Sequence, residues 1–469
     1  MRGVDRSQPA LIFIFGCIFL VQSALGQAVL PPVRDAFVAI ENVTLVDGTG
    51  APPVNGVTIL VAENRIHQIS QSDRAQIPPK TRRINGRNKY VIPGLIDVHV
   101  HYSAPFLSYL YLAHGVTTVR DVGTDVDKIL DFREEIVVGN ALAPRLVVSG
   151  MGINPRTVKS GKFKSPRAMA EYLVNRGVDG IKVTGYELDE LKEIVEVAHA
   201  HGLLVYGHTR LNPGALAAVE GGLDGIEHVT DLMEDCIDEN PPFPSDFDWG
   251  NREHFFKYYY GRLNRVVNLD KVDYLIERMV ENNVYLDPTL INHYRGFVVR
   301  NTPELNADPA FRYMPKQYDR ANRYGTYGPE ERAEWAKTLE LMQEVTRRFY
   351  RAGGFLIMGT DSQAAAPDGA LPGWSMHQEL ELFVQAGLTP MEVLKVATLS
   401  NARVIAREKD LGTVEVGKYA DLILLNADPL EDISNTQKID LVIKDGLILD
   451  PKVLLTEHIR HFGERSQPQ

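Results

Sequence analysis

The chain has 469 residues, of which 44% are hydrophobic and 24% are charged, and its formal net charge is −11. This composition excludes a fibrous or disordered protein and predicts a soluble globular chain with one large domain and a smaller one. The negative charge and the lack of a basic cluster argue against binding to nucleic acid or to an anionic membrane surface, so we expect a small-molecule substrate.

The first residues predict a segment that directs export. Arg2 and Arg6 precede an apolar run over Ala10–Val21, and small residues follow at positions 23–26. This pattern is typical of a secretory signal peptide, which we place at residues 1–26. The apolar run is shorter than the roughly 20 residues that cross a bilayer. We therefore expect a periplasmic or secreted protein with no stable membrane insertion after cleavage, while an uncleaved N-terminal anchor stays open.

Two strand-rich flanks surround the middle of the chain. Short alternating segments run from Phe37 to Ile69, and similar segments return at 420–425 and 440–446. Gly and Asn separate them, as is typical of antiparallel strands. We predict that the flanks, residues 36–93 and 401–455, pair into one small β-sandwich domain formed by both chain ends.

Between the flanks, over residues 94–400, strands alternate with helices such as 188–201 and 213–221, which is the pattern of parallel βαβ units. Eight strand candidates can be counted: Gly94–His99, Val116–Asp121, Arg145–Ser149, Gly180–Thr184, Leu203–His208, Gly225–His228, Val284–Pro288 and Phe355–Thr360. Eight such units predict an α/β fold of the closed (β/α)8 TIM barrel type.

Candidate metal ligands stand at or just beyond the ends of five of these strands. They are His99, His101, Lys182, His208, His228 and Asp361. Active sites of this fold assemble at the carboxyl ends of the strands. Side chains alternate along a strand, so a His-x-His pair points both rings to one face. Imidazole and carboxylate groups suit zinc or a related divalent ion, and the set therefore predicts a metal site.

Lys182 is the unusual member of this set. A protonated ammonium is repelled by a nearby cation, so a lysine at this place must be neutral, turned away or chemically modified. Carbamylation by carbon dioxide would convert Lys182 into a bridging anion. A barrel lysine paired with an acid such as Asp361 is the alternative, and both interpretations stay open on this ground.

Several stretches match a known family in combination. They are 91–101 (VIPGLIDVHVH), 114–123 (HGVTTVRDVG), 180–183 (GIKV), 205–208 (VYGH), 225–228 (GIEH), 358–362 (MGTDS) and 411–425 (LGTVEVGKYADLILL). Together they resemble the amidohydrolase superfamily, over nearly everything after residue 36. The stretch 376–390 (MHQELELFVQAGLTP) resembles its imidazolonepropionase-like and Xaa-Pro dipeptidase branch.

The resemblance implies a centre with two divalent metal ions, of which zinc is the first choice. One ion would be held by His99, His101 and Asp361, the other by His208 and His228, with carboxylated Lys182 bridging both. Two such ions acidify a shared water and polarise a carbonyl group. Asp361 would take the proton of that water and pass it to the leaving group. The sequence thus predicts a metal-dependent hydrolase that cleaves an amide C–N bond in a peptide-like or N-acyl amino acid substrate.

Substrate contacts are predicted after the seventh strand, where His293, Tyr294 and Arg295 could meet a carbonyl or carboxylate group. An ordinary loop histidine is the alternative for His293. The aromatic insertion at 240–262 predicts either a lid over the site or a loop packed on the barrel. Two acids, Asp97 and Asp121, are candidates for orienting the ligating histidines.

Three other functions stay open. An ester, lactone or carbamate hydrolase would use the same two-metal site, whereas a deaminase of this superfamily would use one metal and an unmodified Lys182. A binding protein without catalysis is the third alternative. One departure counts against strict dipeptidase specificity, because residues 184–186 lead almost at once into a helix where such dipeptidases usually carry a longer Gly-rich loop. The sequence leaves a homo-oligomer open.

Overall fold

The computed structural model describes residues 34–159, 161, 163–209, 213–238, 267–300, 302–306, 308–314, 327–363 and 369–463. The predicted signal peptide at 1–26 and the aromatic insertion at 240–262 lie outside these residues. Among the helices that are described, none is long and apolar enough to cross a membrane.

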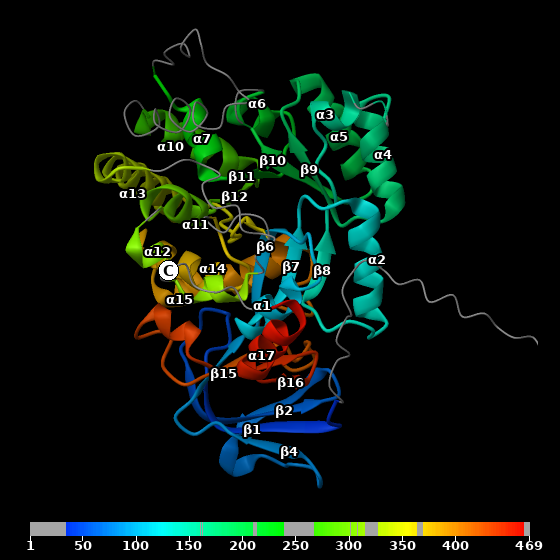
Figure 1. The fold of residues 1–469 in the computed structure, drawn as a ribbon, viewed down its shortest axis with the longest axis vertical. Helices are drawn as coiled ribbons and strands as arrows, with labels where there is room; N and C mark the ends of the chain where they lie inside the picture. Colours follow the sequence, from blue (N-terminus) through cyan, green and yellow to red (C-terminus); the bar gives the residue numbers. More distant parts are fainter. Residues whose placement is uncertain are drawn as a thin grey trace, which may run out of the picture.

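Both chain ends contribute to one mixed sheet of eight strands, which lies below the rest of the molecule in Figure 1. The order is β16-β15-β14-β5-β1-β2-β3, and β4 also pairs with β1. The strands are β1 (Phe37–Leu45), β2 (Val54–Ala62), β3 (Arg65–Gln71), β4 (Arg82–Asn85), β5 (Tyr90–Pro93), β14 (Leu422–Leu425), β15 (Ile439–Lys444) and β16 (Leu447–Leu449).

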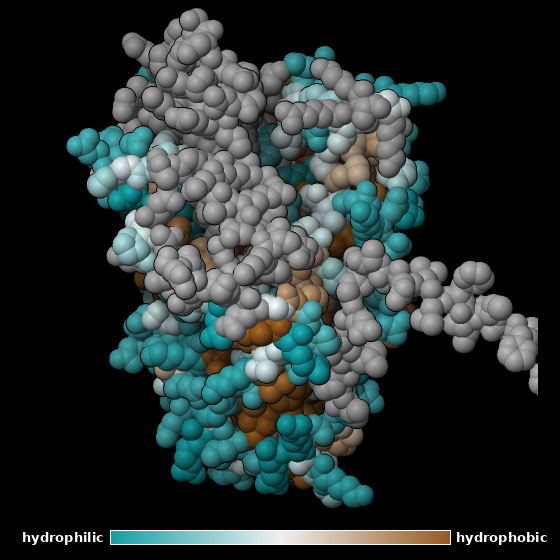
Figure 2. Space-filling view, in the orientation of Figure 1, coloured by the Kyte–Doolittle hydropathy of each residue, from teal (hydrophilic) through white to brown (hydrophobic). Residues whose placement is uncertain are grey.

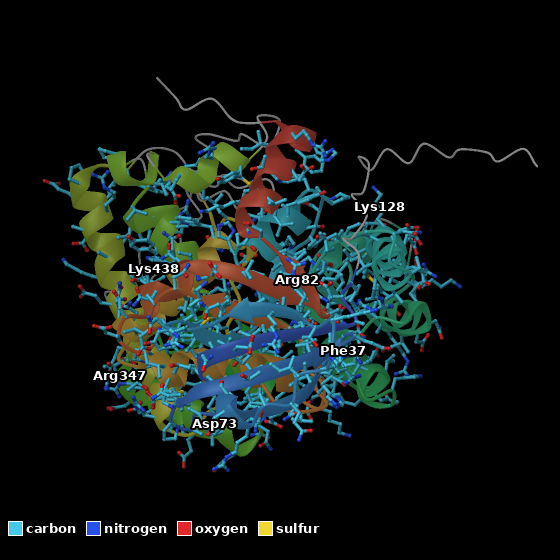
Figure 3. The ribbon with its side chains drawn as sticks, turned by 90° about the horizontal axis from the view of Figure 1, so that it is seen from below. Phe37, Asp73, Arg82, Lys128, Arg347 and Lys438 are labelled. Carbon is cyan, nitrogen blue, oxygen red and sulfur yellow. The ribbon has the colours of Figure 1, made fainter. Side chains whose placement is uncertain are left out.

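The two flanks meet where β14 runs antiparallel to β5, with Leu424 opposite Val91. Figure 3 shows this sheet from below, with the strands of the first flank beside those of the second. Alternate residues such as Val38 and Ile40 on β1 pack with Leu422 and Leu424 on β14 in one buried cluster. The sheet confirms the predicted β-sandwich-like unit, and its strands lie within the two predicted flanks, whose boundaries stay a prediction.

A barrel of parallel strands forms the larger part of the molecule and confirms the predicted TIM-barrel fold. Two four-stranded sheets, β13-β6-β7-β8 and β12-β11-β10-β9, make up its wall. The bridges Ile153–Val183 and Leu286–Leu356 join the two sheets and close the barrel. Its strands are β6 (Leu95–His101), β7 (Val116–Asp121), β8 (Arg145–Val148), β9 (Gly180–Thr184), β10 (Leu204–His208), β11 (Gly225–Glu227), β12 (Tyr285–Asp287) and β13 (Ser362–Gln363).

The eighth predicted strand, Phe355–Thr360, differs from the regular strand that the sequence predicts. Only Leu356 forms a bridge there, and regular pairing with β6 occurs further on, at β13. The reason is that side chains replace the strand ladder as acceptors. The backbone N–H groups of residues 358, 359 and 360 donate to the side chains of Asn401, Asp287 and Asp97.

Helices surround the barrel wall (Figure 1). On α5 (Leu188–His199), Leu191, Ile194, Val195 and Ala198 are buried at the three- and four-residue spacing of one helix face. The others include α1 (Leu107–Ala113), α2 (Val126–Val137), α4 (Pro166–Arg176), α6 (Ala215–Glu220), α7 (Val229–Asp235), α10 (Leu269–Glu281), α13 (Pro329–Arg351), α14 (Trp374–Gln385), α15 (Pro390–Lys395) and α17 (Pro451–Phe462). Figure 2 shows a largely hydrophilic described surface on this face, with apolar side chains gathered around α17.

Candidate metal centre

The six predicted ligands come from strand ends and converge on one cavity of about 380 Å³. His99 and His101 are on β6, Lys182 is on β9 and His208 ends β10, while His228 follows β11 and Asp361 precedes β13. Five of them line the cavity: His101, Lys182, His208, His228 and Asp361. His99 lies behind this lining and is fully buried. The barrel therefore brings all six predicted residues to one end.

The His99 ring has two different sides. Its Nδ1 faces the carboxylates of Glu227 and Asp287, the latter at 3.1 Å, while its Nε2 lies 2.9 Å from the Lys182 ammonium. Burial and Lys182 disfavour the charged ring, but Glu227 and Asp287 outweigh them and raise the pKa of His99 to about 9. Two acceptors at Nδ1 hold a proton there, so Nε2 is the atom directed toward the centre.

A buried arginine supports this arrangement from inside the barrel. Arg120 on β7 donates to Glu227 at 2.8 Å, to the carbonyl oxygen of Val98 at 2.6 Å and to the Tyr285 hydroxyl at 3.1 Å. Its guanidinium also lies 4.1 Å from the ring centroid of Tyr206. The guanidinium and His99 together hold the pKa of Glu227 well below its usual value although burial acts in the opposite direction. Glu227 is thus an ionised carboxylate that orients His99.

The second histidine pair is oriented by other groups. His208 Nδ1 lies 3.1 Å from an oxygen of Asp231, and His228 Nδ1 lies 2.6 Å from the Thr289 hydroxyl. The two rings are stacked with centroids 4.7 Å apart. Burial, His208 and His99 lower the pKa of His228 well below its usual value, so this ring is neutral. Neutral imidazoles are the form that binds metals.

Asp361 is held by both of its oxygens. His101 Nε2 lies 2.9 Å from Oδ1, and the Asn292 amide donates to Oδ2 at 2.7 Å. Its own N–H donates to the carbonyl oxygen of His99 at 2.8 Å, at a positive φ of 54°. His228 and Thr289 also have positive φ, 75° and 49°. Strained backbone of this kind clusters at functional sites, where the surrounding structure holds it in place.

Close packing places His101 over a glycine. A Cβ atom on Gly123 would lie 2.2 Å from His101 Nδ1, closer than any real contact. Position 123, in the loop after β7, therefore has to lack a side chain for the His101 ring to reach Asp361. The Val-Gly at the end of stretch 114–123 is the sequence signal for this contact.

The donor set fits a divalent cation. His99, His228 and Asp361 offer ligand atoms that all lie within 4.8 Å of one another. A second group with the same spacing consists of His99, Glu227 and Asp287, all fully buried. Arg120 on Glu227 opposes a further cation there, so we assign that group to orienting His99. The first group, with His101, His208 and Lys182 around it, is the better candidate for a metal site.

Lys182 lies at the centre of this set, 4% exposed. Burial lowers the pKa of Lys182, although Glu227 and Asp361 act in the opposite direction. Its Nζ stands 2.9 Å from His99 Nε2, the atom that would bind a metal. An unmodified ammonium would therefore compete with a cation for His99, and a carboxylated Lys182 would remove this conflict.

Of the three residues predicted to contact substrate, His293, Tyr294 and Arg295, only His293 lines the cavity. His293 lines the cavity, and its Nε2 lies 2.9 Å from the carbonyl oxygen of Trp335. Arg295 is 1% exposed and points away, because its guanidinium binds Asp308 at 2.6 Å, Gln378 at 2.9 Å and the Gly369 carbonyl at 2.9 Å. Neither Arg295 nor Tyr294 is among the described residues that line the cavity.

The two acids predicted to orient the ligating histidines, Asp97 and Asp121, accept hydrogen bonds from backbone N–H and hydroxyl groups. Asp121 accepts from the N–H of Tyr102 at 2.8 Å and from Thr124 Oγ1 at 2.6 Å, and so it fixes the loops beside His101. Asp97 accepts from the N–H of His99 at 3.3 Å and from the Thr360 hydroxyl at 2.6 Å. Both acids therefore hold the backbone around the ligands. The carboxylates that face the histidine rings belong to Glu227, Asp287 and Asp231.

Sequence reasoning missed the groups that contact the ligand side chains and the arginine that holds one of these groups. They are Arg120, Glu227, Asp231, Asp287, Thr289 and Asn292. The available signal was a charged residue within a predicted barrel strand, as Arg120 is in 116–121 and Glu227 is in 225–228. Asn292 carried no such signal, because its approach to Asp361 depends on the short helix α11 (Leu290–His293) after β12.

A buried carboxylate anchors that helix. Glu379 on α14 accepts from the N–H groups of Leu290 at 2.8 Å and Ile291 at 2.6 Å, at the start of α11. These N–H groups have no acceptor within the helix, so Glu379 satisfies them. Burial raises the pKa of Glu379 well above its usual value. The contact fixes α11 and with it the position of Asn292.

Comparison with known proteins agrees with this geometry. The model of the Amidohydrolase family matches residues 90–449. An uncharacterized protein of Mycobacterium tuberculosis is 23% identical over 392 residues, covering 77% of this chain and 86% of that protein. A solved Xaa-Pro dipeptidase with bound methionine in its active site has a TM-score of 0.63 at 23% identity and covers 88% of this chain and 100% of its own.

A further solved structure, phenylurea hydrolase B, has a TM-score of 0.63 at 20% identity and covers 90% of this chain and 98% of its own. At these identities the structures show the shared fold, while the family follows from the sequence model, which spans the barrel and the C-terminal strands. The resemblance inferred from the sequence motifs is confirmed. The chain belongs to the amidohydrolase family, and it is an enzyme that acts on carbon–nitrogen bonds.

Proposed function

We propose that this enzyme hydrolyses the amide C–N bond of a small peptide-like or N-acyl amino acid substrate at a centre for two divalent ions, zinc being the first candidate. His99, His101 and Asp361 would hold one ion, His208 and His228 the other, and a carboxylated Lys182 would join them. The observation that supports this most is that five of these residues line one cavity and the sixth, His99, stands directly behind them.

When bound, the ions supply a Lewis acid for the scissile carbonyl group and an acidified water. The protein supplies the base. Burial alone would raise the pKa of Asp361, but His101 and His99 hold that pKa well below its usual value, so Asp361 is ionised and accepts a proton. It then donates this proton to the leaving nitrogen.

The neighbours of Asp361 keep it ready for that transfer. Asn292 donates to Oδ2 of Asp361, which limits rotation of the carboxylate and leaves Oδ1 facing His101 and His99. Holding a group in its reactive geometry before the reaction removes part of the entropic barrier. Lys182 contributes differently, because its lowered pKa leaves a larger share of neutral amine, the form that attacks carbon dioxide.

The experiment is a hydrolysis screen of the zinc-loaded enzyme. Dipeptides, N-acyl amino acids, lactones and aryl esters are offered together, and products are identified by mass spectrometry. We expect cleavage of amides, and the loss of this cleavage in Asp361→Asn. Cleavage confined to esters or lactones would overturn the amide proposal, while leaving a hydrolase with the same site.

One observation favours a single-metal deaminase as the second candidate. The three ligand atoms that lie within 4.8 Å of one another belong to His99, His228 and Asp361, and Lys182 adjoins His99 as an amine. Elemental analysis and carbon-13 NMR after incubation with labelled bicarbonate separate the two. Two metal equivalents and a carbamate signal that is absent from Lys182→Gln support the two-metal hydrolase. One equivalent without that signal supports the deaminase.

A further inference from the structure

An unusual helical turn forms one wall of the cavity. After α11 the chain continues as a π-helical turn, η4 (Tyr294–Val298), which is wider than an α-helix. Such turns are rare and are frequent at functional sites. Gly296 lies in this turn, is buried, and lines the cavity together with Phe297 and with Met342 of α13. The turn therefore presents a residue without a side chain to the site.

The space in front of Gly296 is open. A Cβ atom added at Gly296 would have no atom of the described residues outside its own helix turn and its chain neighbours within 4 Å. Its φ is not in the left-handed region, so the backbone does not require glycine there. The contrast with Gly123, where a Cβ would collide with His101, is direct. Neither backbone conformation nor packing among the described residues explains the glycine, whereas space for a ligand does.

The walls beside this opening are apolar and rigid. The Phe297 ring is stacked on His293 with centroids 5.0 Å apart and tilted against Trp335, also at 5.0 Å. Met342 is 2% exposed. Burial lowers the pKa of His293 to about 4, so its ring is neutral at physiological pH. None of Gly296, Phe297 and Met342 carries a charge, unlike Lys182 and Asp361, which line the same cavity.

We propose that Gly296, Phe297 and Met342 form a recess for a bulky apolar group of the substrate, an aromatic ring above all, and that the missing side chain at position 296 sets its size. This inference rests on the proposed amide hydrolysis and adds the substrate class: amides with an aromatic group next to the scissile bond. Aromatic rings prefer offset-stacked or edge-to-face contacts, which Phe297 can offer, and a thioether also packs well on a ring.

Gly296→Leu tests the recess because it adds an apolar side chain at a position where a Cβ would meet no atom of the described residues within 4 Å. Two matched substrate pairs are compared: N-acetylalanine with N-phenylacetylalanine, which differ on the acyl side, and N-acetylalanine with N-acetylphenylalanine, which differ on the amine side. We expect the wild type to prefer the aromatic member of one pair. Gly296→Leu should lower kcat/KM for that member about 10-fold or more and change it for N-acetylalanine by less than about 2-fold.

Graded and matched variants complete the test. Gly296→Ala should give a smaller loss in the same direction, and it keeps the test available if Gly296→Leu fails to fold, because alanine is a better helix former than glycine. Gly328→Ala lies outside the cavity lining, and its Cβ would meet nothing closer than 3.8 Å among the described residues, so it should change neither pair. Equal losses for both members of a pair, or none, would overturn the recess.

Binding measured by calorimetry tests the recess independently of hydrolysis, so failure of the recess and failure of the proposed function can be told apart. If the wild type hydrolyses neither these amides nor any amide of the substrate screen, the proposed function is overturned, and binding of phenylacetate and phenylalanine then decides on the recess. Binding of either compound to the wild type that is weakened about 10-fold in Gly296→Leu supports the recess. Equal binding to both proteins, or no binding to the wild type, contradicts it.

Discussion

His99 at the candidate metal centre and His377 on α14 are equally buried, at 0% and 1% exposure, yet their pKa values are shifted in opposite directions. Burial disfavours the charged form of both rings. Glu227 and Asp287 nevertheless raise the pKa of His99 to about 9. The ring nitrogens of His377 lie against the Thr436 hydroxyl and the His114 carbonyl oxygen, and burial lowers the pKa of His377 to about 3. Charge on the partner, more than burial, therefore decides the direction in which the pKa of these two histidines moves.

The same distinction applies to other histidines. His208 has a carboxylate at Nδ1, while His114 and His458 bind the backbone carbonyl oxygens of Leu110 and Tyr313. Carboxylate partners orient a ring toward a cation and make it more basic. Carbonyl partners hold a neutral ring in the packing between helices. The following predictions test this difference.

Asp361→Asn should have the largest effect. The amide cannot take a proton, so kcat should fall by about 10²- to 10⁴-fold. Metal content by elemental analysis should stay near that of the wild type, because five other ligands remain. A variant that loses both metal and activity would make Asp361 a ligand alone, and near-normal hydrolysis would remove it from the mechanism.

Arg120→Met should destabilise the fold by about 3–5 kcal/mol, because it leaves the Glu227 carboxylate buried without its cation. Urea unfolding measures this change. The matched control is Arg133→Gln, which removes a partly exposed ion pair with Asp179 at 2.8 Å and should cost no more than about 1 kcal/mol. Similar losses in both variants would contradict the role given to the interior charge.

Glu227→Gln and Asp231→Asn compare the carboxylates behind the two histidine pairs. Each variant should weaken metal binding about 10- to 100-fold, because a carboxylate that orients the ring is replaced by an amide. Titration with a competing chelator gives these affinities. Thr436→Val, which removes the hydroxyl partner of His377, is the control and should leave metal affinity unchanged.

The pH dependence of stability tests the structural histidines. The folded state binds the His377 proton less tightly than the unfolded state, whose pKa is near 6.5. The stability is therefore complete above about pH 6.5 and declines as pH falls toward 3, by at most about 1.4 kcal/mol per pH unit for this residue. His293, with a pKa of about 4, should add a similar decline.

His377→Gln should make this decline shallower, because its amide can accept from Thr436 and donate to His114 without titrating. Urea unfolding at several pH values between 7 and 4 gives the slope. An unaltered slope in His377→Gln would contradict the assignment of a neutral buried ring.

Prediction from the sequence succeeded where one short stretch carries the information. Alternation along a strand was enough to place His99 and His101 on one face, and apolar runs closed by polar residues located seven of the eight barrel strands. The eighth differs because Asn401, Asp287 and Asp97 replace its ladder partners. Those side chains come from three separate elements, so no pattern within residues 355–360 predicts these hydrogen bonds.

The sequence by itself determined the fold class, the strand ends and the six candidate ligands, because strand periodicity and residue chemistry are local properties. Only the tertiary structure decided which groups stand behind the ligands. Glu227 contacts His99 although the two residues are 128 positions apart in the sequence, and Asn292 contacts Asp361 at a separation of 69 positions. Arg295 points away from the cavity and binds Asp308. Barrel closure and the placement of α11 by Glu379 create these contacts, which is why they could not be predicted from strand patterns alone.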